Sequence, residues 1–153
     1  MNELQDQRGV LKRYKDEKGV TEIFIPDNVG IIDEGAFCDC TNLVRILVPD
    51  TVQVISDTAF SGCENLKCIA LPESTIRVGW YAFRGCRSLK DLTIPSTLKE
   101  IGKYAFAGCD CLSKVKVTHD DKVYEFNLRG ELDNERWQKI RHSLSSIGKD
   151  IAS

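Results

Sequence analysis

The sequence lacks any long apolar run. No stretch of the 153 residues approaches the roughly 20 consecutive apolar residues that a membrane-spanning helix needs. Residues 1–8 mix polar, acidic and basic side chains, without the apolar segment found at the centre of a signal peptide. We therefore expect a soluble, cytoplasmic protein with no membrane span. If the chain is a fragment of a longer protein, a secreted or surface location would also fit.

The sequence also lacks an excess of charge of one sign. Lys and Arg total 21 against 23 Asp and Glu, which gives a formal net charge of -2. Binding to nucleic acid or to an anionic membrane through the overall field of the protein requires a clear positive excess. We therefore expect no nucleic-acid partner.

Proline is scarce, but its four residues fall in one register. Pro26, Pro49, Pro72 and Pro95 are spaced 23 residues apart, so the chain is a tandem array. Units of this size stack into a solenoid, which presents long regular surfaces and seldom a catalytic pocket. The same period recurs in three further columns: the Ala-Phe pairs Ala36-Phe37, Ala59-Phe60, Ala82-Phe83 and Ala105-Phe106; the cysteines Cys40, Cys63, Cys86 and Cys109; and the apolar residues Val20, Leu43, Leu66, Leu89 and Leu112.

Each unit predicts a short strand followed by a turn. The units are residues 20–42, 43–65, 66–88 and 89–111, with a partial fifth at 112–117. Apolar residues alternate before each proline, which is typical of a strand with one buried face, and proline then ends the ladder because it has no N–H to donate. We expect the Phe column to fill the core. A tight turn with positive φ is expected at Gly62, Gly85 and Gly108, and at Asp39 in the first unit.

One unit departs from this pattern. Over residues 73–81, Thr75 takes a position that is apolar in the other units, where it is Val29, Val52 or Leu98. We expect that coil to be locally irregular.

The two ends are expected to be caps of a single domain that spans residues 1–153. A solenoid needs polar-faced covers over its terminal coils. Residues 1–19 would form the N-terminal cap, with a strand at 10–14, and residues 118–153 would complete the C-terminal cap.

The C-terminal cap is predicted to be a hairpin followed by a helix. The hairpin strands are expected at 115–117 and 123–128, and the helix begins after Asp133 as N-cap and ends near Gly148. An apolar stripe at helical spacing would dock the helix on the last coil. The alternative is that this stripe contacts a partner or a second copy of the chain. The stripe consists of Trp137, Ile140, Leu144 and Ile147.

Four of the seven cysteines belong to the repeat, and packing explains them. We expect Cys40, Cys63, Cys86 and Cys109 to be buried, reduced thiols, because small apolar groups occupy such columns. Disulfide bonds or a metal site are the alternative. Cys38, Cys68 and Cys111 lie outside the column and are the candidates for exposed thiols.

Few residues point to catalysis. The two histidines are His119, in a charged turn, and His142, on the polar side of the helix, and the register implies no nucleophile or metal ligand set beside either. We expect both to have solvated structural roles. No glycine-rich loop leads into a Lys-Ser/Thr phosphate-binding motif. We therefore expect a protein that is not an enzyme, with no catalytic residues, metal or cofactor.

The repeat resembles a known family. The element Ala-Phe-x-Gly-Cys, present at residues 59–63, 82–86 and 105–109, is similar to that of BspA-like leucine-rich repeats, and the resemblance covers residues 20–117. It implies a curved repeat solenoid, mainly β with turns, with a parallel sheet on its concave face. It also implies a role in protein–protein interaction or cell-surface adhesion, often in bacteria or protists, without naming a ligand.

The side chains between the buried residues of each strand must face outward, and they form two columns on the predicted concave sheet. We expect these columns to bind a protein partner, with Glu22 and Arg45, and Asp91 and Lys114, as neighbouring opposite charges. The first column is Glu22, Arg45, Cys68, Asp91 and Lys114, and the second is Phe24, Leu47, Ala70, Thr93 and Lys116.

Three alternatives to this binding surface remain. Trp80 and Tyr81, expected on the convex side, are a secondary candidate because aromatic anchors are common at binding hot spots. Self-association through an end cap, as a homo-oligomer, would be a different kind of binding. Thiol or metal chemistry is the alternative outside binding.

Overall fold

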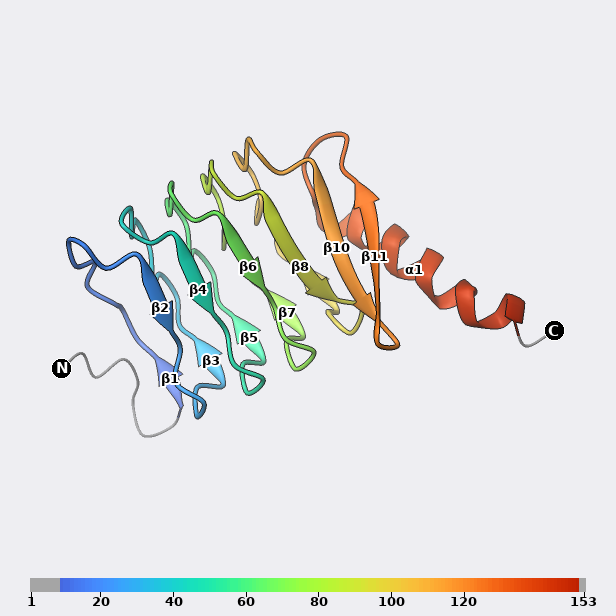
Figure 1. The fold of residues 1–153 in the computed structure, drawn as a ribbon, viewed down its shortest axis with the longest axis horizontal. Coiled ribbons are helices and arrows are strands. Elements are labelled where there is room, and N and C mark those ends of the chain that lie inside the picture. The colour runs from blue at the N-terminus through green and yellow to red at the C-terminus, as the bar shows by residue number, and fades with distance from the viewer. Residues whose placement is uncertain (1–8, 152–153) are drawn as a thin grey trace.

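Two sheets of short strands form the walls of a solenoid (Figure 1). The computed structural model describes residues 9–151, with side chains up to residue 147. The six-stranded sheet runs in the order β11 (Lys122–Asn127), β10 (Lys114–His119), β8 (Asp91–Pro95), β6 (Cys68–Ala70), β4 (Arg45–Leu47) and β2 (Glu22–Phe24). The five-stranded sheet runs in the order β1 (Val10–Leu11), β3 (Ile31–Ile32), β5 (Val54–Ile55), β7 (Arg77–Val78) and β9 (Glu100–Ile101).

Neighbouring coils pair at an offset of one repeat. In the six-stranded sheet Ile23 lies opposite Ile46, and Ile69 lies opposite Leu92, and all four side chains are buried. The strands are parallel except β11, which is antiparallel to β10. The predicted solenoid with a parallel sheet is confirmed. The five-stranded sheet is an additional finding, because strands of two residues are too short to show an alternating pattern in the sequence.

The Phe column fills the core, as predicted. Phe37, Phe60, Phe83 and Phe106 are at most 2 % exposed, and adjacent rings are stacked with centroids 5.1 Å apart. The rings are inclined to each other by only 3–4°, because each sits in the same place in successive coils. Stacked phenyl rings therefore tie each coil to the next along the length of the core.

The turn before each cysteine adopts positive φ, as predicted. Asp39 has a φ of 58°, and Gly62, Gly85 and Gly108 have values of 73–78°. A second column of positive φ was not expected, because only its first member is glycine. It consists of Gly35, Thr58, Tyr81 and Tyr104. Hydrogen bonds between coils hold it: the N–H groups of Thr58 and Tyr81 donate to the carbonyls of Trp80 and Lys103, at 2.8 and 3.0 Å.

The coil that contains Thr75 is regular, so the expectation of a local irregularity was wrong. Val78 in β7 lies opposite Ile55 on one side and Ile101 on the other. Thr75 is fully buried, and its Oγ1 donates to the carbonyl oxygen of Val52 at 2.9 Å. A buried hydroxyl is tolerated when it has such a partner. Thr75 therefore takes the place of an apolar residue without displacing the chain.

The N-terminal segment is a shortened coil of the stack. Only the first two residues of the strand predicted at 10–14 are a strand, namely β1, in which Leu11 lies opposite Ile32. Tyr14 leaves the sheet, and its N–H donates to the carbonyl of Ala36 at 2.7 Å. Its ring centroid lies 5.6 Å from that of Phe37, so Tyr14 continues the Phe column by one member. Residues 1–8 of the predicted cap lie outside the described residues.

The predicted hairpin is confirmed at the other end. β10 and β11 pair from Lys114 opposite Asn127 to His119 opposite Lys122. Asp120 and Asp121 form a two-residue turn with φ values of 48° and 61°. Two successive positive φ values are the geometry of the tight hairpin turns that suit the twist of the strands.

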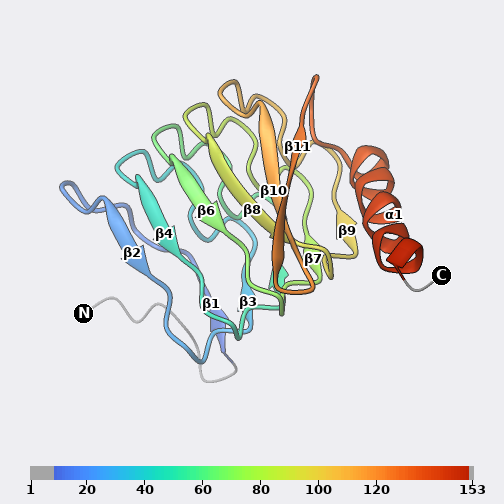
Figure 2. The same cartoon turned by 45° about the vertical axis from the view of Figure 1, so that its right-hand side comes forward.

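Helix α1 (Asn134–Ile151) covers the C-terminal end of the stack beside β9 (Figure 2). The predicted N-cap is confirmed, because Asp133 Oδ1 accepts a hydrogen bond from the Arg136 N–H at 2.8 Å. The predicted end at Gly148 is wrong, since the helix continues to Ile151. Glycine within a helix costs only about 1 kcal/mol and does not by itself end it. Among residues 9–151, no helix is long and apolar enough to cross a membrane.

The apolar stripe of α1 docks on the last coil, as predicted. Trp137, Ile140 and Leu144 are buried, and the Trp137 Nε1–H donates to the Leu98 carbonyl at 2.8 Å. Ile147 remains 36 % exposed, so it is the member of the stripe left at the surface. Most of the stripe is thus buried against the last coil of the same chain.

Candidate interaction surface

The predicted outward residues form two columns on the six-stranded sheet. We call this surface, made of the ten residues of both columns, the six-strand face. Register places Glu22 opposite Arg45, and Arg45 opposite Cys68, which in turn lies opposite Asp91. The second column is held in the same way, with pairs Phe24–Leu47, Ala70–Thr93 and Thr93–Lys116. Each of the ten side chains is exposed or half-buried.

The second column changes character along the stack. Phe24 is 67 % exposed at the N-terminal end and lies beside the half-buried Leu47. Ala70 and Thr93 follow, and Lys116 ends the column. A phenyl ring exposed to this extent on a sheet gains free energy when a partner covers it, because apolar area is removed from water.

Three of the four charged residues in the first column have no ion-pair partner among residues 9–151. Neither of the two expected neighbouring pairs, Glu22 with Arg45 and Asp91 with Lys114, forms an ion pair there, and Lys114 Nζ instead lies 3.6 Å from Glu125 Oε1. The hairpin is the reason: it returns β11 to the side of β10, where Glu125 becomes a neighbour. Within residues 9–151, Glu22, Arg45 and Asp91 form no ion pair within 4 Å. Their charges remain available to a partner.

β11 extends the six-strand face by one more strand, which the sequence analysis did not include. Thr118 lies opposite Val123, Lys116 opposite Glu125 and Lys114 opposite Asn127. Val123 is 60 % exposed. The predicted hairpin was the signal, since residues that pair with outward positions of β10 must themselves point outward.

The cysteine column is largely buried, as predicted. Cys40, Cys63 and Cys86 are at most 1 % exposed, whereas Cys109 is half-buried in the last coil. The Sγ of Cys63 donates to the Phe37 carbonyl at 3.1 Å, and Cys86 and Cys109 repeat this bond one coil further on, each at 3.2 Å. Burial raises the pKa of Cys40 and of Cys109 to about 12, which keeps these thiols neutral and unreactive.

The three cysteines outside the column differ in exposure. Cys111 is exposed, whereas Cys38 and Cys68 are half-buried, so the prediction of exposed thiols holds fully for Cys111 alone. Burial and the neighbouring Asp39 raise the pKa of Cys38. All seven cysteines are free thiols. In the part of the chain that the structure describes, no three His, Cys, Asp or Glu side chains are placed to hold a metal ion.

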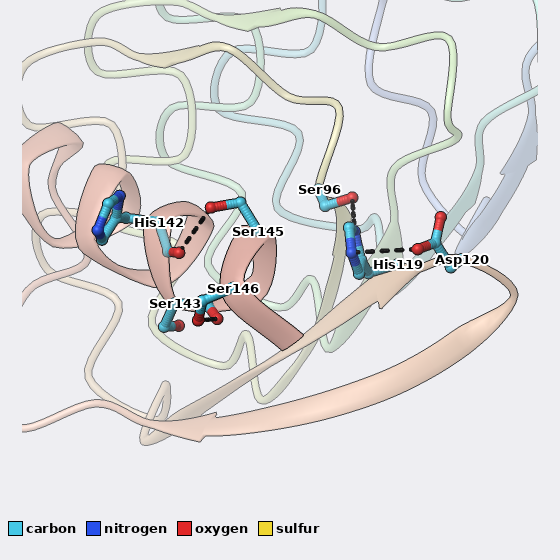
Figure 3. Close-up of polar contacts among 7 residues, drawn as sticks. All are labelled: Ser96, His119, Asp120, His142, Ser143, Ser145 and Ser146. Carbon is cyan, nitrogen blue, oxygen red and sulfur yellow. Dashed lines mark hydrogen bonds and ion pairs between the residues drawn. The ribbon is translucent and has the colours of Figure 1, made fainter. Parts of the chain in front are cut away.

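His119 does have a hydroxyl neighbour, contrary to expectation. Ser96 Oγ and His119 Nδ1 are 2.8 Å apart, and His119 Nε2 lies 3.4 Å from Asp120 Oδ2 (Figure 3). The signal was in the register, because Ser96 precedes His119 by one repeat. Asp120 is 85 % exposed in the hairpin turn, and such an exposed carboxylate contributes little. The contacts tie the hairpin turn to the residue that follows β8. His142 is exposed on α1, as predicted.

Trp80 and Tyr81 lie after β7, away from the six-strand face. Trp80 is 50 % exposed, and Tyr81 is half-buried. The Tyr81 ring stacks on Tyr104 with centroids 5.4 Å apart, and the guanidinium of Arg84 lies 5.4 Å from the Tyr81 centroid. Tyr104, 49 % exposed, was not predicted, although it follows Tyr81 by one repeat.

Several solved structures of bacterial leucine-rich repeat proteins are similar to this chain. One from Bacteroides ovatus is 39% identical with a TM-score of 0.63, and the match covers 69% of this chain and 28% of that protein. One from Bacteroides capillosus is 29% identical with a TM-score of 0.65, covering 72% of this chain and 86% of the other. A leucine rich cell surface protein from Faecalibacterium prausnitzii is 25% identical with a TM-score of 0.52, covering 72% and 35%.

The chain thus spans only a minor part of two of these proteins. Because one of them is a cell surface protein, the cytoplasmic location of this chain stays a prediction. No curated protein matches the chain. The BspA type leucine rich repeat region matches residues 12–128 in six copies. This is more than the four full and one partial units predicted for residues 20–117, since the match also takes in the shortened N-terminal coil and the hairpin. The chain belongs to the BspA type leucine-rich repeat family.

Proposed function

We propose that this protein is a non-enzymatic module that binds a partner protein through the six-strand face. Leucine-rich repeat proteins are typically protein-interaction or surface modules and are generally non-enzymatic scaffolds. The observation that carries the proposal is the apolar end of the face, where Phe24 is 67 % exposed beside Leu47.

The chemistry of the face suits a protein surface. Burying the exposed part of Phe24 and Leu47 contributes about 25 cal/mol for each Å² of apolar area removed from water. Glu22 and Arg45 lie in the neighbouring column, and Asp91 lies further along it. An apolar patch with charged residues beside it is common in protein interfaces, in which the charges select the partner and its orientation.

Affinity capture from the source cells, with the retained proteins identified by mass spectrometry, tests this proposal. The variant Phe24→Glu/Leu47→Glu is expected to lose the partners that the parent protein retains. Its melting temperature should stay within a few degrees, because both side chains lie on the outward face of the sheet, where substitutions usually change stability by about 0.5 kcal/mol.

The matched control places the same two charges on the other side of the solenoid. Ile31 in β3 and Ile76, just before β7, are each 40 % exposed, so Ile31→Glu/Ile76→Glu should retain every partner. If the first variant keeps all partners and the control or Trp80→Ala loses them, the partner binds the opposite side and the six-strand face is the wrong site.

A further inference from the structure

A groove lies on the other side of the solenoid, between the last two coils and the beginning of α1. Trp80, Tyr104, Glu100 and Glu131 line it, and its volume is about 480 Å³. We call it the Trp80 groove. Figure 2 shows its surroundings, with β7, β9 and α1 adjacent at the C-terminal end of the stack. It shares no residue with the six-strand face, so its function is independent of the one proposed for that surface.

The aromatic rings of the Trp80 groove are exposed, yet their backbone is fixed. The Trp80 N–H donates to Asp57 Oδ1 at 2.8 Å. Gly102 lies against the same peptide: a Cβ at this position would lie 2.5 Å from the Trp80 nitrogen, so only glycine lets the next coil approach so closely. Tyr104 is held by its stack on Tyr81. Groups positioned before binding lose little conformational entropy when a ligand arrives.

Two carboxylates in the Trp80 groove are uncommitted. Within residues 9–151, the side chains of Glu100 and Glu131 form no ion pair or hydrogen bond. The nearby Asp133 is engaged, because it caps α1. Lys103 is the only cationic side chain among the residues that line the groove. The groove therefore combines two half-exposed aromatic rings with an excess of negative charge.

We propose that the Trp80 groove binds an Arg or Lys side chain of a basic peptide segment. A cation is attracted to the face of an aromatic ring, most strongly to that of Trp, and carboxylates beside the ring add charge-assisted hydrogen bonds. Tyr81, whose ring stacks on Tyr104 of the groove, already holds a cation in this way, since the Arg84 guanidinium lies over the Tyr81 ring. Glu100 and Glu131 favour a cationic ligand over a neutral sugar, which would also stack on Trp80.

The fluorescence of Trp80 reports directly on this groove. The chain has two tryptophans, and Trp137 is fully buried, so emission from a half-exposed indole and quenching by acrylamide arise from Trp80. Titration with an acetylated, amidated tetra-arginine peptide is expected to change the emission and to protect Trp80 from acrylamide. Calorimetry with the same peptide gives an affinity that does not depend on the fluorophore.

Two variants and one control decide the outcome. Glu100→Gln/Glu131→Gln and Trp80→Leu are each expected to weaken peptide binding by about tenfold or more. Glu64→Gln/Glu73→Gln removes the same charge from exposed sites outside the groove and should bind like the parent protein. The proposal is overturned if the control weakens binding as much as the first variant, if both groove variants bind normally, or if cellohexaose protects Trp80 and the peptide does not. Phe24→Glu/Leu47→Glu should still bind the peptide, which separates this test from that of the six-strand face.

Discussion

Three of the four thiols of the cysteine column donate a hydrogen bond to the coil before them. Sγ of Cys63, Cys86 and Cys109 donates to the carbonyl of a phenylalanine 26 residues earlier. A cysteine in this position packs as a small apolar group and also offers a weak donor to a carbonyl oxygen inside the core. The recurrence of cysteine is therefore explained by packing in the core and by hydrogen bonding between successive coils.

Alkylation of the native protein should separate the cysteines by position. We expect iodoacetamide at pH 8 to modify Cys111 quickly and Cys40, Cys63 and Cys86 slowly, because burial keeps their thiols protonated. Cys109 should react only slightly faster than these three. Peptide mapping by mass spectrometry measures each rate, and all sites should react fully in denaturant. Rapid native labelling of Cys63 would contradict the buried ladder.

The raised pKa values also predict a loss of stability in alkali. In the unfolded chain a thiol loses its proton near its ordinary pKa of 9.0, whereas Cys40 and Cys109 in the folded protein keep theirs until about 12. The free energy of unfolding should thus be unaffected by these thiols below about pH 9. Between about pH 9 and 12 it should fall by up to about 1.4 kcal/mol per pH unit for each thiol.

Urea unfolding at pH 8 and pH 10.5 tests this dependence. Because burial raises the pKa of Cys63 and Cys86 as well, Cys63→Ala/Cys86→Ala should lose less stability between the two pH values than the parent protein does. Equal losses would show that other groups, and not the ladder, determine the alkaline sensitivity.

Thr75 offers a test of how the core tolerates a polar group. Thr75→Val restores the apolar residue of this column, and the Val52 carbonyl keeps a partner because Ser74 Oγ also donates to it, at 2.8 Å. We expect the free energy of unfolding to stay within about 1 kcal/mol of the parent value, or to rise. Thr75→Ala, which leaves a cavity, should be the less stable of the two in urea unfolding. The reverse order would contradict this description of the site.

Some single-residue features could not be predicted from residue type. Thr58 and Tyr81 adopt positive φ although branched and aromatic residues disfavour it, because hydrogen bonds from their N–H groups to the next coil impose the conformation. The contact between Ser96 and His119 was predictable, since the 23-residue register places them side by side, but only if the register is extended past residue 117 into the hairpin.

At the scale of elements, helix α1 depends on its contact with the last coil. Trp137 is fully buried and donates to the Leu98 carbonyl, whereas Ile147, on the same stripe, is 36 % exposed. We expect Trp137→Ala to lower the free energy of unfolding by about 3–5 kcal/mol, and Ile147→Ala by less than about 1 kcal/mol. Thermal unfolding followed by circular dichroism measures both. Similar effects from the two variants would mean that α1 docks differently.

Elements differ in how far the sequence predicts them. The strands of the six-stranded sheet, the hairpin and the start of α1 follow from alternation, a short turn and an N-cap residue. The five-stranded sheet does not, because strands such as Ile31–Ile32 and Val54–Ile55 gain their pairing from the stacking of coils and not from their own pattern. The end of α1 does not follow from glycine alone, because Gly148 lies within the helix.

At the scale of the whole molecule, the solenoid turns a repeated sequence into two surfaces of different chemistry. On the six-strand face the second column passes from Phe24 through Ala70 to Lys116, so one end is apolar and the other cationic. The Trp80 groove, on the other side, combines aromatic rings with carboxylates. The repeat register predicts which residues share a surface and that Phe24 faces outward, whereas the pairing of Lys114 with Glu125 follows only from the folded chain.

The most direct test of binding through the six-strand face uses a thiol that the chain already has there. Cys68 lies between Arg45 and Asp91 in the first column, and Cys111 is exposed outside this face. The rate of alkylation at both sites would be measured by mass spectrometry, with and without the partner recovered by affinity capture. We predict that the partner slows modification of Cys68 and leaves that of Cys111 unchanged. An unchanged rate at Cys68 in the saturated complex would contradict binding through this face.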